Sequence, residues 1–323
     1  MKWLTRVLGL LALMIAALWL FFPREPVTLS ADFDPRRFGE GIGVYLESTE
    51  SGVPNLRPAA TKRIVWAGDA ETRTDLSIVY LHGFSASAEE IRPVPDRVAT
   101  TLNANLVFTR FTGHGRDGAA MTEASMADWM ADAAEALALG RATGDRVVVI
   151  ATSTGATFAA LAALDPDMRK DVAGMVFVAP NFGINNPMAS LLTWPAARYW
   201  APLLAGQERS FEPQNAEQAA HWTTRYPSVA ALPVAAAVQA AARADYSQTT
   251  IPALFYYDAD DQVVDATATD AVRTDWGGPV SLARPPKGPG MDPLAHVIAG
   301  DILSPAGTEP AVTAILDWIG GLP

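Results

Sequence analysis

The sequence predicts an α/β protein built on a mostly parallel, twisted sheet with helices on both faces. Short, strongly apolar runs alternate with segments of helical period along most of the 323-residue chain. Strands that are apolar along their whole length are typical of parallel sheets buried on both sides. The composition agrees, because 50% of the residues are hydrophobic and only 18% are charged, which is enough for a large buried core.

The N-terminal segment stands apart from this alternation. Lys2 and Arg6 precede an uncharged apolar run over residues 7–22, and the sequence Pro-Arg-Glu-Pro follows it. As a helix, the run would span roughly 24 Å, slightly less than a bilayer core unless residues 3–4 extend it. Residues 1–26 are therefore expected to be a signal anchor or a signal peptide.

An uncleaved anchor is the favoured interpretation of this segment. No A-x-A cleavage pattern follows the apolar run, and its aromatic end resembles an interfacial belt of Trp19, Phe21 and Phe22. The positive-inside rule would place Lys2 and Arg6 in the cytoplasm and export the body to the periplasm or cell exterior. The alternatives are secretion after signal cleavage and a buried first helix of a soluble domain.

After a linker over residues 27–40, strands and helices alternate to the C-terminus. The first two extended segments are 42–50 and 61–68, and the Pro- and Asn-containing stretch 52–58 between them predicts a hairpin-type connection. The later strands are apolar runs that end in Gly, Pro or polar residues, and the helices between them have helical spacing. We expect strands within 76–83, 103–118, 146–152, 172–180, 251–261 and 278–286, and helices within 85–102, 125–142, 155–166, 266–276 and 309–321.

The alternation breaks between about residues 181 and 250. This stretch has no strong strand and is rich in Pro, Trp and Ala. A structureless loop of that length would be improbable in a compact domain. The sequence therefore predicts a core over 41–180 and 251–323, interrupted after its sixth strand by an inserted subdomain over 181–250.

Ser153 is the best candidate for a nucleophile. It follows the apolar strand and precedes a small-residue helix, so a sharp turn would hold its hydroxyl at the sheet edge where parallel sheets bind ligands. Such a turn needs tiny residues two positions before and two after the serine. Here they are Ala151 and Gly155, a small departure from the usual G-x-S-x-G. An ordinary βα loop with a Thr/Ser helix cap is the alternative.

A catalytic serine needs a general base, and His296 is the best placed of the four histidines. It lies in a loop between the last expected strand and the last helix, where a base would reach over the strand ends. A histidine in an ordinary surface loop is the alternative. His82 ends an earlier strand and is expected to be structural.

The base in turn needs a carboxylate to orient it, and the strand at 251–257 leads into an acidic loop. Asp258, Asp260, Asp261 and Asp265 compete for this role. We select Asp261 because the following Val-Val pair would pin the loop; Asp258 is the second choice and Asp260 the third. A solvated acidic turn is the alternative.

Two backbone N–H groups complete the candidate site as an oxyanion hole. Thr154 would supply one at the start of the helix after the turn. Phe84 would supply the other, because His82-Gly83-Phe84 follows a strand and Gly83 lets the backbone approach closely.

The overall charge and the missing cysteine exclude several function classes. A net charge of −11 and a pI near 4.8 argue against a nucleic-acid partner, which needs basic surface. With no cysteine, the chain has no disulfide, thiolate metal site or cysteine nucleophile. No motif indicates a metal, a nucleotide or a flavin, so we expect no cofactor.

Five motifs in this order resemble the α/β-hydrolase superfamily, and more narrowly its serine carboxylesterases and monoacylglycerol-lipase-like lysophospholipases. They are YLHGFSAS, TGHGRDG, ATSTGA, DADDQVVD and AHVIAGD, and the resemblance covers the chain from about residue 41 to 323. It implies an α/β-hydrolase fold in which the helix-prone segment around 185–245 forms a lid over Ser153. His114 matches a position that shapes the site without transferring a proton.

The resemblance implies a serine hydrolase that cleaves carboxylic esters through an acyl-enzyme on Ser153. The expected partner is a small-molecule ester with an apolar acyl group, such as a lipid or monoacylglycerol-like ester. Apolar residues of the insertion would favour such a substrate if they faced the pocket, and packing of the lid onto the core is the alternative for them. An acyltransferase with the same triad and a catalytically silent binding protein are the alternative functions.

Overall fold

The computed structural model describes residues 2–323, except for the side chains of Lys2, Ile15 and Leu18. Met1, the first residue of the expected anchor, lies outside the described residues.

A seven-stranded sheet in the order β1-β3-β2-β4-β5-β8-β9 forms the centre of the body. All its neighbouring strands pair in parallel except β1 with β3, which confirms the predicted mostly parallel sheet. The strands are β1 (Arg63–Val65), β2 (Thr74–Leu81), β3 (Asn105–Phe108), β4 (Gly144–Thr152), β5 (Val172–Val178), β8 (Ala253–Tyr256) and β9 (Val280–Ala283).

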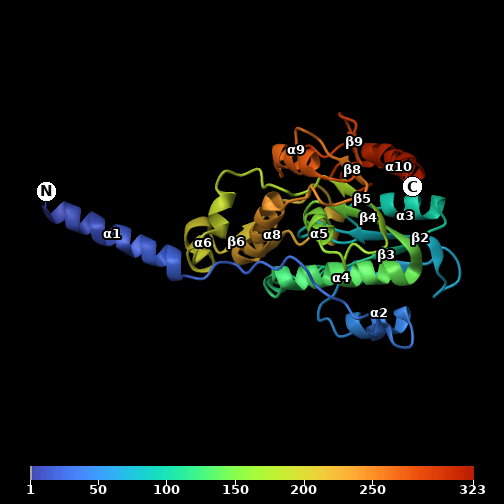
Figure 1. Cartoon of the computed structure of the whole chain (residues 1–323), viewed down its shortest axis with the longest axis horizontal. Helices are drawn as coiled ribbons and strands as arrows, with labels where there is room; N and C mark the ends of the chain where they lie inside the picture. Colours follow the sequence, from blue (N-terminus) through green and yellow to red (C-terminus); the bar gives the residue numbers. More distant parts are fainter. Residues whose placement is uncertain (1) are drawn as a thin grey trace.

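Helices cover both faces of this sheet, as the sequence predicts (Figure 1). One face carries α3 (Val94–Thr101) and α10 (Pro305–Gly320), and the other carries α4 (Met126–Thr143), α5 (Thr154–Ala162), α8 (Ala231–Arg243) and α9 (Ala266–Asp275). Single 3₁₀ turns connect several elements: η1 (Pro35–Phe38), η2 (Pro58–Ala60), η3 (Ala119–Thr122), η4 (Ala189–Thr193) and η5 (Ser228–Ala230).

The central strand β4 shows why its sequence is apolar throughout. Val147 and Val149 pack into the core under α4 and α5, whereas Val148 and Ile150 pack into the core under α3 and α10. Successive side chains of a strand point to opposite faces, so a strand covered on both faces needs apolar residues at every position.

The first expected strand is wrong, because residues 42–50 form the helix α2 (Ile42–Glu50). Its buried residues are Ile42, Tyr45, Leu46 and Glu50, which follow helical spacing. The Ile, Val and Tyr of IGVYL are residue types enriched in strands, which explains the wrong prediction. The expected hairpin through 52–58 is wrong for the same reason, and β1 pairs with β3 instead. The insertion therefore follows the fifth strand of the sheet and not the sixth.

The segment after β5 contributes no strand to the main sheet until β8. Besides α8, it holds α6 (Ala197–Ala205), α7 (Ala216–His221) and an unexpected two-stranded antiparallel ribbon of β6 (Glu208–Ser210) and β7 (Arg225–Pro227). The Thr223 N–H donates to Ser85 O over 2.7 Å, and Gln214 Nε2 donates to Asp292 Oδ1 over 2.8 Å. The insertion is thereby tied to loops after β2 and after β9.

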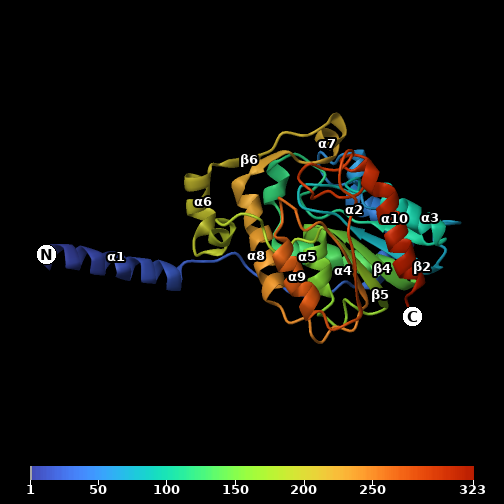
Figure 2. The same cartoon turned by 90° about the horizontal axis from the view of Figure 1, so that it is seen from above.

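The N-terminal helix α1 (Lys2–Phe21) projects away from the body (Figures 1 and 2). By length and composition alone, its stretch from Trp3 to Phe21 suffices to cross a membrane. The segment just after α1 contacts the insertion, where the Ala196 N–H donates to Pro23 O over 2.8 Å.

Candidate active site

Ser153 lies in a tight turn between β4 and α5. Its φ of +50° is in the left-handed region, which is uncommon for a residue with a side chain. The Ser153 N–H donates to Val178 O over 3.0 Å, and the Ser153 side chain does not cap the helix. Gly155 brings α5 against β2, because a Cβ at that position would lie 2.3 Å from Leu81 O. The turn thus leaves the serine hydroxyl free for another partner.

His296 is held in the loop after β9 by a carboxylate that sequence reasoning missed. Asp292 Oδ2 accepts hydrogen bonds from the backbone N–H of His296 (3.3 Å) and of Val297 (3.0 Å). The Asp292 N–H in turn donates to Ser304 Oγ over 2.8 Å. The only sequence signal was an acidic residue four positions before the histidine.

Asp261 lies in the loop after β8 with both carboxylate oxygens engaged. Its Oδ1 accepts the backbone N–H groups of Val263 (2.8 Å) and Val264 (2.9 Å), which fixes the carboxylate in the turn. Its Oδ2 lies 2.8 Å from Nδ1 of His296, whose Nε2 lies 3.1 Å from Ser153 Oγ. The structure therefore brings Ser153, His296 and Asp261 into one hydrogen-bonded row.

The other three acidic candidates have different partners. Asp258 and Asp260 both pair with Lys287, and Asp258 Oδ1 also accepts the Asp260 N–H over 2.9 Å. Asp265 caps the start of α9, where its side chain accepts from the Thr267 N–H over 2.8 Å.

Burial and charge act in opposite directions on His296. Burial alone would lower the pKa of its imidazole, but the hydrogen bond and charge of Asp261, with the charges of Glu90 and Asp292, raise the pKa above the ordinary histidine value. The net effect is to favour the imidazolium that forms when His296 accepts a proton.

The two expected oxyanion donors come from the start of α5 and from the loop after β2. Thr154 is the first residue of α5, so its N–H has no acceptor within the helix. Phe84 follows Gly83 after β2, and a Cβ built on Gly83 would lie 3.1 Å from Ser153 Cβ. Within residues 2–323, no hydrogen-bond acceptor pairs with either N–H.

Glu90 is a buried carboxylate beside the serine that sequence reasoning also missed. Its Oε2 accepts the Gly83 N–H (2.7 Å) and the Tyr80 hydroxyl (3.1 Å). Burial raises the pKa of Glu90 to about 7, although the Gly83 hydrogen bond and the charge of His296 act in the opposite direction. The sequence AEEIRP holds two adjacent glutamates, and nothing in it shows which one is buried.

His82 and His114 are both buried and held neutral by burial. Burial lowers the pKa of His82 to about 4, its Nδ1 lies 2.8 Å from Gly83 O, and its Nε2 accepts the Phe111 N–H over 3.2 Å. Burial also lowers the pKa of His114 well below its ordinary value. The ring nitrogens of both histidines contact backbone groups of Gly83, Phe111 and Thr112, and neither ring is hydrogen-bonded to Ser153.

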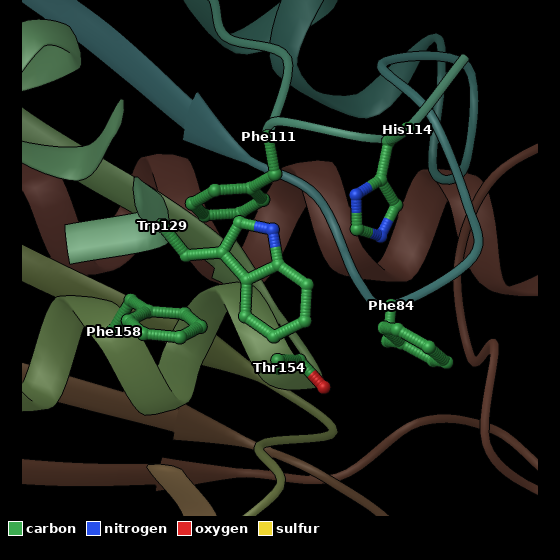
Figure 3. A pocket seen from close by; sticks show the side chains of 6 residues that line it. All are labelled: Phe84, Phe111, His114, Trp129, Thr154 and Phe158. Atoms are coloured by element: carbon green, nitrogen blue, oxygen red, sulfur yellow. The ribbon is translucent and has the colours of Figure 1, made fainter. Parts of the chain in front are cut away.

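A narrow aromatic hollow adjoins the two oxyanion donors (Figure 3). In this conformation no part of the hollow is wide enough for a water molecule. Its lining residues are Phe84, Phe111, His114, Trp129, Thr154 and Phe158. The chemistry available at the site is thus a serine next to an oriented base, two free N–H groups and an apolar recess.

Among residues 2–323, no cluster of three or more His, Asp or Glu side chains is arranged to hold a metal ion.

Comparison with protein families agrees with this architecture. A model of the Hydrolase_4 family, described as serine aminopeptidase S33, matches residues 72–278. A comparison with curated proteins gave no match.

Solved structures share the fold at low sequence identity. A structure of the metagenome-derived lipolytic enzymes LipS and LipT has a TM-score of 0.65 and 18% identity, covering 82% of this chain and 99% of that one. The monoacylglycerol lipase of Paleococcus ferrophilus has a TM-score of 0.54 and 11% identity, covering 80% and 97%. A soluble variant of the monoglyceride lipase of Saccharomyces cerevisiae has a TM-score of 0.54 and 12% identity, covering 80% and 90%.

Proposed function

We propose that this chain, which belongs to the Hydrolase_4 family of α/β-hydrolases, is a serine hydrolase. It cleaves carboxylic esters through an acyl-enzyme on Ser153. The observation that carries the proposal is the row of hydrogen bonds from Ser153 Oγ to His296 (3.1 Å) and from His296 to Asp261 (2.8 Å). A hydroxyl next to an imidazole that a carboxylate orients is the arrangement that nucleophilic acyl transfer requires.

In the first half-reaction, Ser153 Oγ attacks the ester carbonyl while His296 Nε2 takes the hydroxyl proton. Asp261 keeps a proton on Nδ1, so Nε2 presents a lone pair to the serine, and its charge stabilises the resulting imidazolium. When the carbon–oxygen bond of the ester breaks, the imidazolium gives its proton to the departing alcohol oxygen. The acyl group remains on Ser153.

In the second half-reaction, His296 takes a proton from water, whose oxygen attacks the acyl-enzyme. The bond between the acyl carbon and Ser153 Oγ then breaks, His296 returns the proton to Ser153 Oγ, and the carboxylic acid leaves. The N–H groups of Phe84 and Thr154 hold the oxyanion in both tetrahedral intermediates, where such fixed donors stabilise developing charge strongly. An alcohol in place of water would give acyl transfer with the same residues, and product analysis separates the two reactions.

Two observations support an ester with an apolar acyl group as the substrate. The hollow beside the oxyanion donors is lined mainly by aromatic rings, and apolar walls with few polar groups are typical of sites for apolar ligands. Structures with the same fold include lipolytic enzymes and monoacylglycerol lipases. We assign residues 181–250 as a lid inserted between core segments 41–180 and 251–323.

The apolar helix α1 supports a membrane location for this hydrolase. We assign residues 1–26 as an uncleaved signal anchor with Lys2 and Arg6 in the cytoplasm and the catalytic body exported. A body beside the bilayer would have direct access to lipid esters.

The test is hydrolysis of p-nitrophenyl esters of increasing acyl length by the full chain in detergent, with aminoacyl p-nitroanilides alongside because of the family description. We expect ester turnover that falls at least about a thousandfold in Ser153→Ala. Ser51→Ala, at an exposed serine just after α2, should retain full activity.

Covalent labelling by a fluorophosphonate probe checks the nucleophile independently of the substrate. Ser153 should carry the label in the parent chain, and no label should appear in Ser153→Ala. Full ester turnover in Ser153→Ala would refute the assignment, and turnover of anilides alone would replace the ester with a peptide substrate. A folded chain that is neither labelled nor active would be a silent binding protein.

A further inference from the structure

Four large apolar side chains lie exposed in the insertion, one just before α6 and three within it. They are Trp194, Tyr199, Leu203 and Leu204, with exposed fractions of 48%, 66%, 76% and 81%; we call this set the lid edge. In α6, Ala197 and Ala201 are buried against the body, so Tyr199 and Leu203 occupy the opposite side of the helix. A group of exposed apolar residues of this size indicates an interaction surface.

The lid edge is tied directly to the end of the apolar helix α1. The ring of Trp194 meets the ring of Trp19 edge-to-face at a centroid distance of 5.4 Å. Arg198, in the first turn of α6, pairs with Glu25, and the Ala196 N–H donates to Pro23 O. Both cartoon views place α6 at the part of the body nearest to α1 (Figures 1 and 2).

These contacts set the depth of the lid edge relative to a bilayer. A helix of 20 residues such as α1 is about 30 Å long and matches the hydrocarbon core. With α1 inserted, Trp19 and Pro23 lie at the interface, where Trp and Tyr side chains are enriched. Leu204 follows Arg198 by six residues, a rise of about 9 Å along the axis of α6, so the lid edge starts at the contact with Glu25 and extends over a short stretch beside it.

We propose that the lid edge is a membrane-contact surface, which α1 and its linker hold against the lipid headgroups and upper acyl chains. The inference rests on the membrane location of α1 in the proposed function, but not on catalysis. The bound partner is a lipid bilayer, because the surface is apolar with Trp and Tyr at its rim and adjoins a segment long enough to span one. Its charged neighbours Arg198 and Glu25 neutralise each other, so anionic lipid is not required.

The missing cysteines make this contact directly measurable. Because the chain has none, Leu203→Cys or Leu204→Cys introduces a single site for a nitroxide label in the full chain, reconstituted in phosphatidylcholine vesicles. Oxygen, which concentrates in the bilayer, and a water-soluble nickel complex then report the depth of the label. Val44→Cys on α2, also an exposed apolar position (57%), is the matched control, and Leu11→Cys in α1 reports insertion.

We expect labels at 203, 204 and 11 to be relaxed mainly by oxygen and the label at 44 mainly by the nickel complex. Labels at 203 and 204 as accessible to the nickel complex as the label at 44 would overturn the proposal, and so would a water-exposed label at 11. The measurement is independent of turnover, so it decides the question in Ser153→Ala as well. Loss of all esterase activity would therefore count against the proposed function alone.

A second readout links the surface to lipid substrates. Replacing Leu203 and Leu204 together by Asp should reduce turnover of a long-chain ester embedded in vesicles at least tenfold. Turnover of a soluble short-chain ester should stay unchanged, since neither leucine contacts the candidate site. An equal loss on both substrates would contradict a surface role.

Discussion

At the scale of single residues, the candidate site depends on groups that orient its reactive atoms. Asp292 holds the backbone of His296, the N–H groups of Val263 and Val264 hold Asp261, and Glu90 holds Gly83 next to Phe84. Such supporting contacts fix geometry to within fractions of an ångström, which acyl transfer needs.

The raised pKa of His296 predicts the acid limb of the pH–rate profile. The neutral imidazole is the base, so kcat/KM should rise with pH through a pKa above the ordinary histidine value. In Asp261→Asn, burial still lowers the pKa of His296 but the main opposing charge is gone, so the limb should move to lower pH. The rate should also fall by about a thousandfold or more, because the amide favours the wrong tautomer. An acid limb in the same place in both proteins would contradict the pairing.

Glu90 predicts a pH dependence of stability. Its pKa rises from 4.5, taken as the unfolded value, to about 7 in the folded chain, so the folded state binds the proton more tightly. The stabilisation from this proton is present below the unfolded value and is lost as pH rises to about 7, a difference of about 3 kcal/mol. Glu90→Gln stays neutral, so its free energy of unfolding should fall less between pH 5 and pH 8. Urea melts at the two pH values measure this, and equal losses in both proteins would exclude a buried, titrating Glu90.

At the scale of elements, the close approach of α5 to β2 sets the position of the serine turn. A Cβ at Gly155 would lie 2.3 Å from Leu81 O and 2.6 Å from His82 O, both rigid backbone atoms. The φ of Gly155 is not in the left-handed region, so its backbone conformation does not require glycine. Glycine is required there because a side chain would not fit. The start of α5 therefore packs directly against the backbone at the end of β2.

Gly155→Ala tests this close approach. The added methyl must displace α5 from β2, so we expect a loss of about 1–3 kcal/mol in the free energy of unfolding and a larger relative loss of activity. The matched control is Gly320→Ala at the end of α10, where a Cβ meets nothing within 4 Å. Gly320→Ala should leave the free energy of unfolding unchanged or raise it by up to about 1 kcal/mol. Equal effects at both positions in denaturant melts would show that the contact has no energetic role.

The sequence predicts the elements whose signal is local and misses those that depend on tertiary contacts. The strand before Ser153 is apolar at every position, and Ala151 and Gly155 flank the serine, so the strand–turn–helix unit is readable from the chain. The prediction of a strand at residues 42–50 is wrong because α2 is stabilised by its packing against other elements of the body. Tyr45 donates to Glu135 on α4, and Glu50 pairs with Arg110 after β3, contacts far apart in sequence.

The same distinction holds for the candidate site. Chain order and loop position select Ser153, Asp261 and His296 as candidates, and the structure brings these three side chains together. Glu90 and Asp292 were missed because their role comes from burial and from backbone groups that the fold brings to them. Only the folded chain distinguishes buried Glu90 from Glu89, which pairs with Arg63 and Arg92.

At the scale of the whole molecule, an acidic body is joined to a short apolar helix. The whole chain carries a net charge of −11, and the apolar run over residues 7–22 contains none of its charged residues. Pro23 and Glu25, just after α1, contact Ala196 and Arg198 at the start of α6, and the insertion is the part of the body that lies nearest to α1 (Figure 2). This orientation matters only if α1 stays attached.

Retention of α1 is therefore the decisive property of the whole molecule. Expressed in bacteria with residues 1–26 included, the chain should stay in the membrane pellet after alkaline carbonate extraction, since a spanning helix resists extraction. The intact mass of the purified protein should include residues 1–26, because no A-x-A site follows the apolar run and Trp19 is packed on Trp194.

A variant that starts at residue 27 separates anchoring by α1 from binding by the lid edge. Release of this variant into the soluble fraction, with the full chain retained, is the expected result. A mature chain that starts near Pro23 and is recovered free of membranes would instead identify residues 1–22 as a cleaved signal peptide, and the contacts of Trp19 would exist only before cleavage.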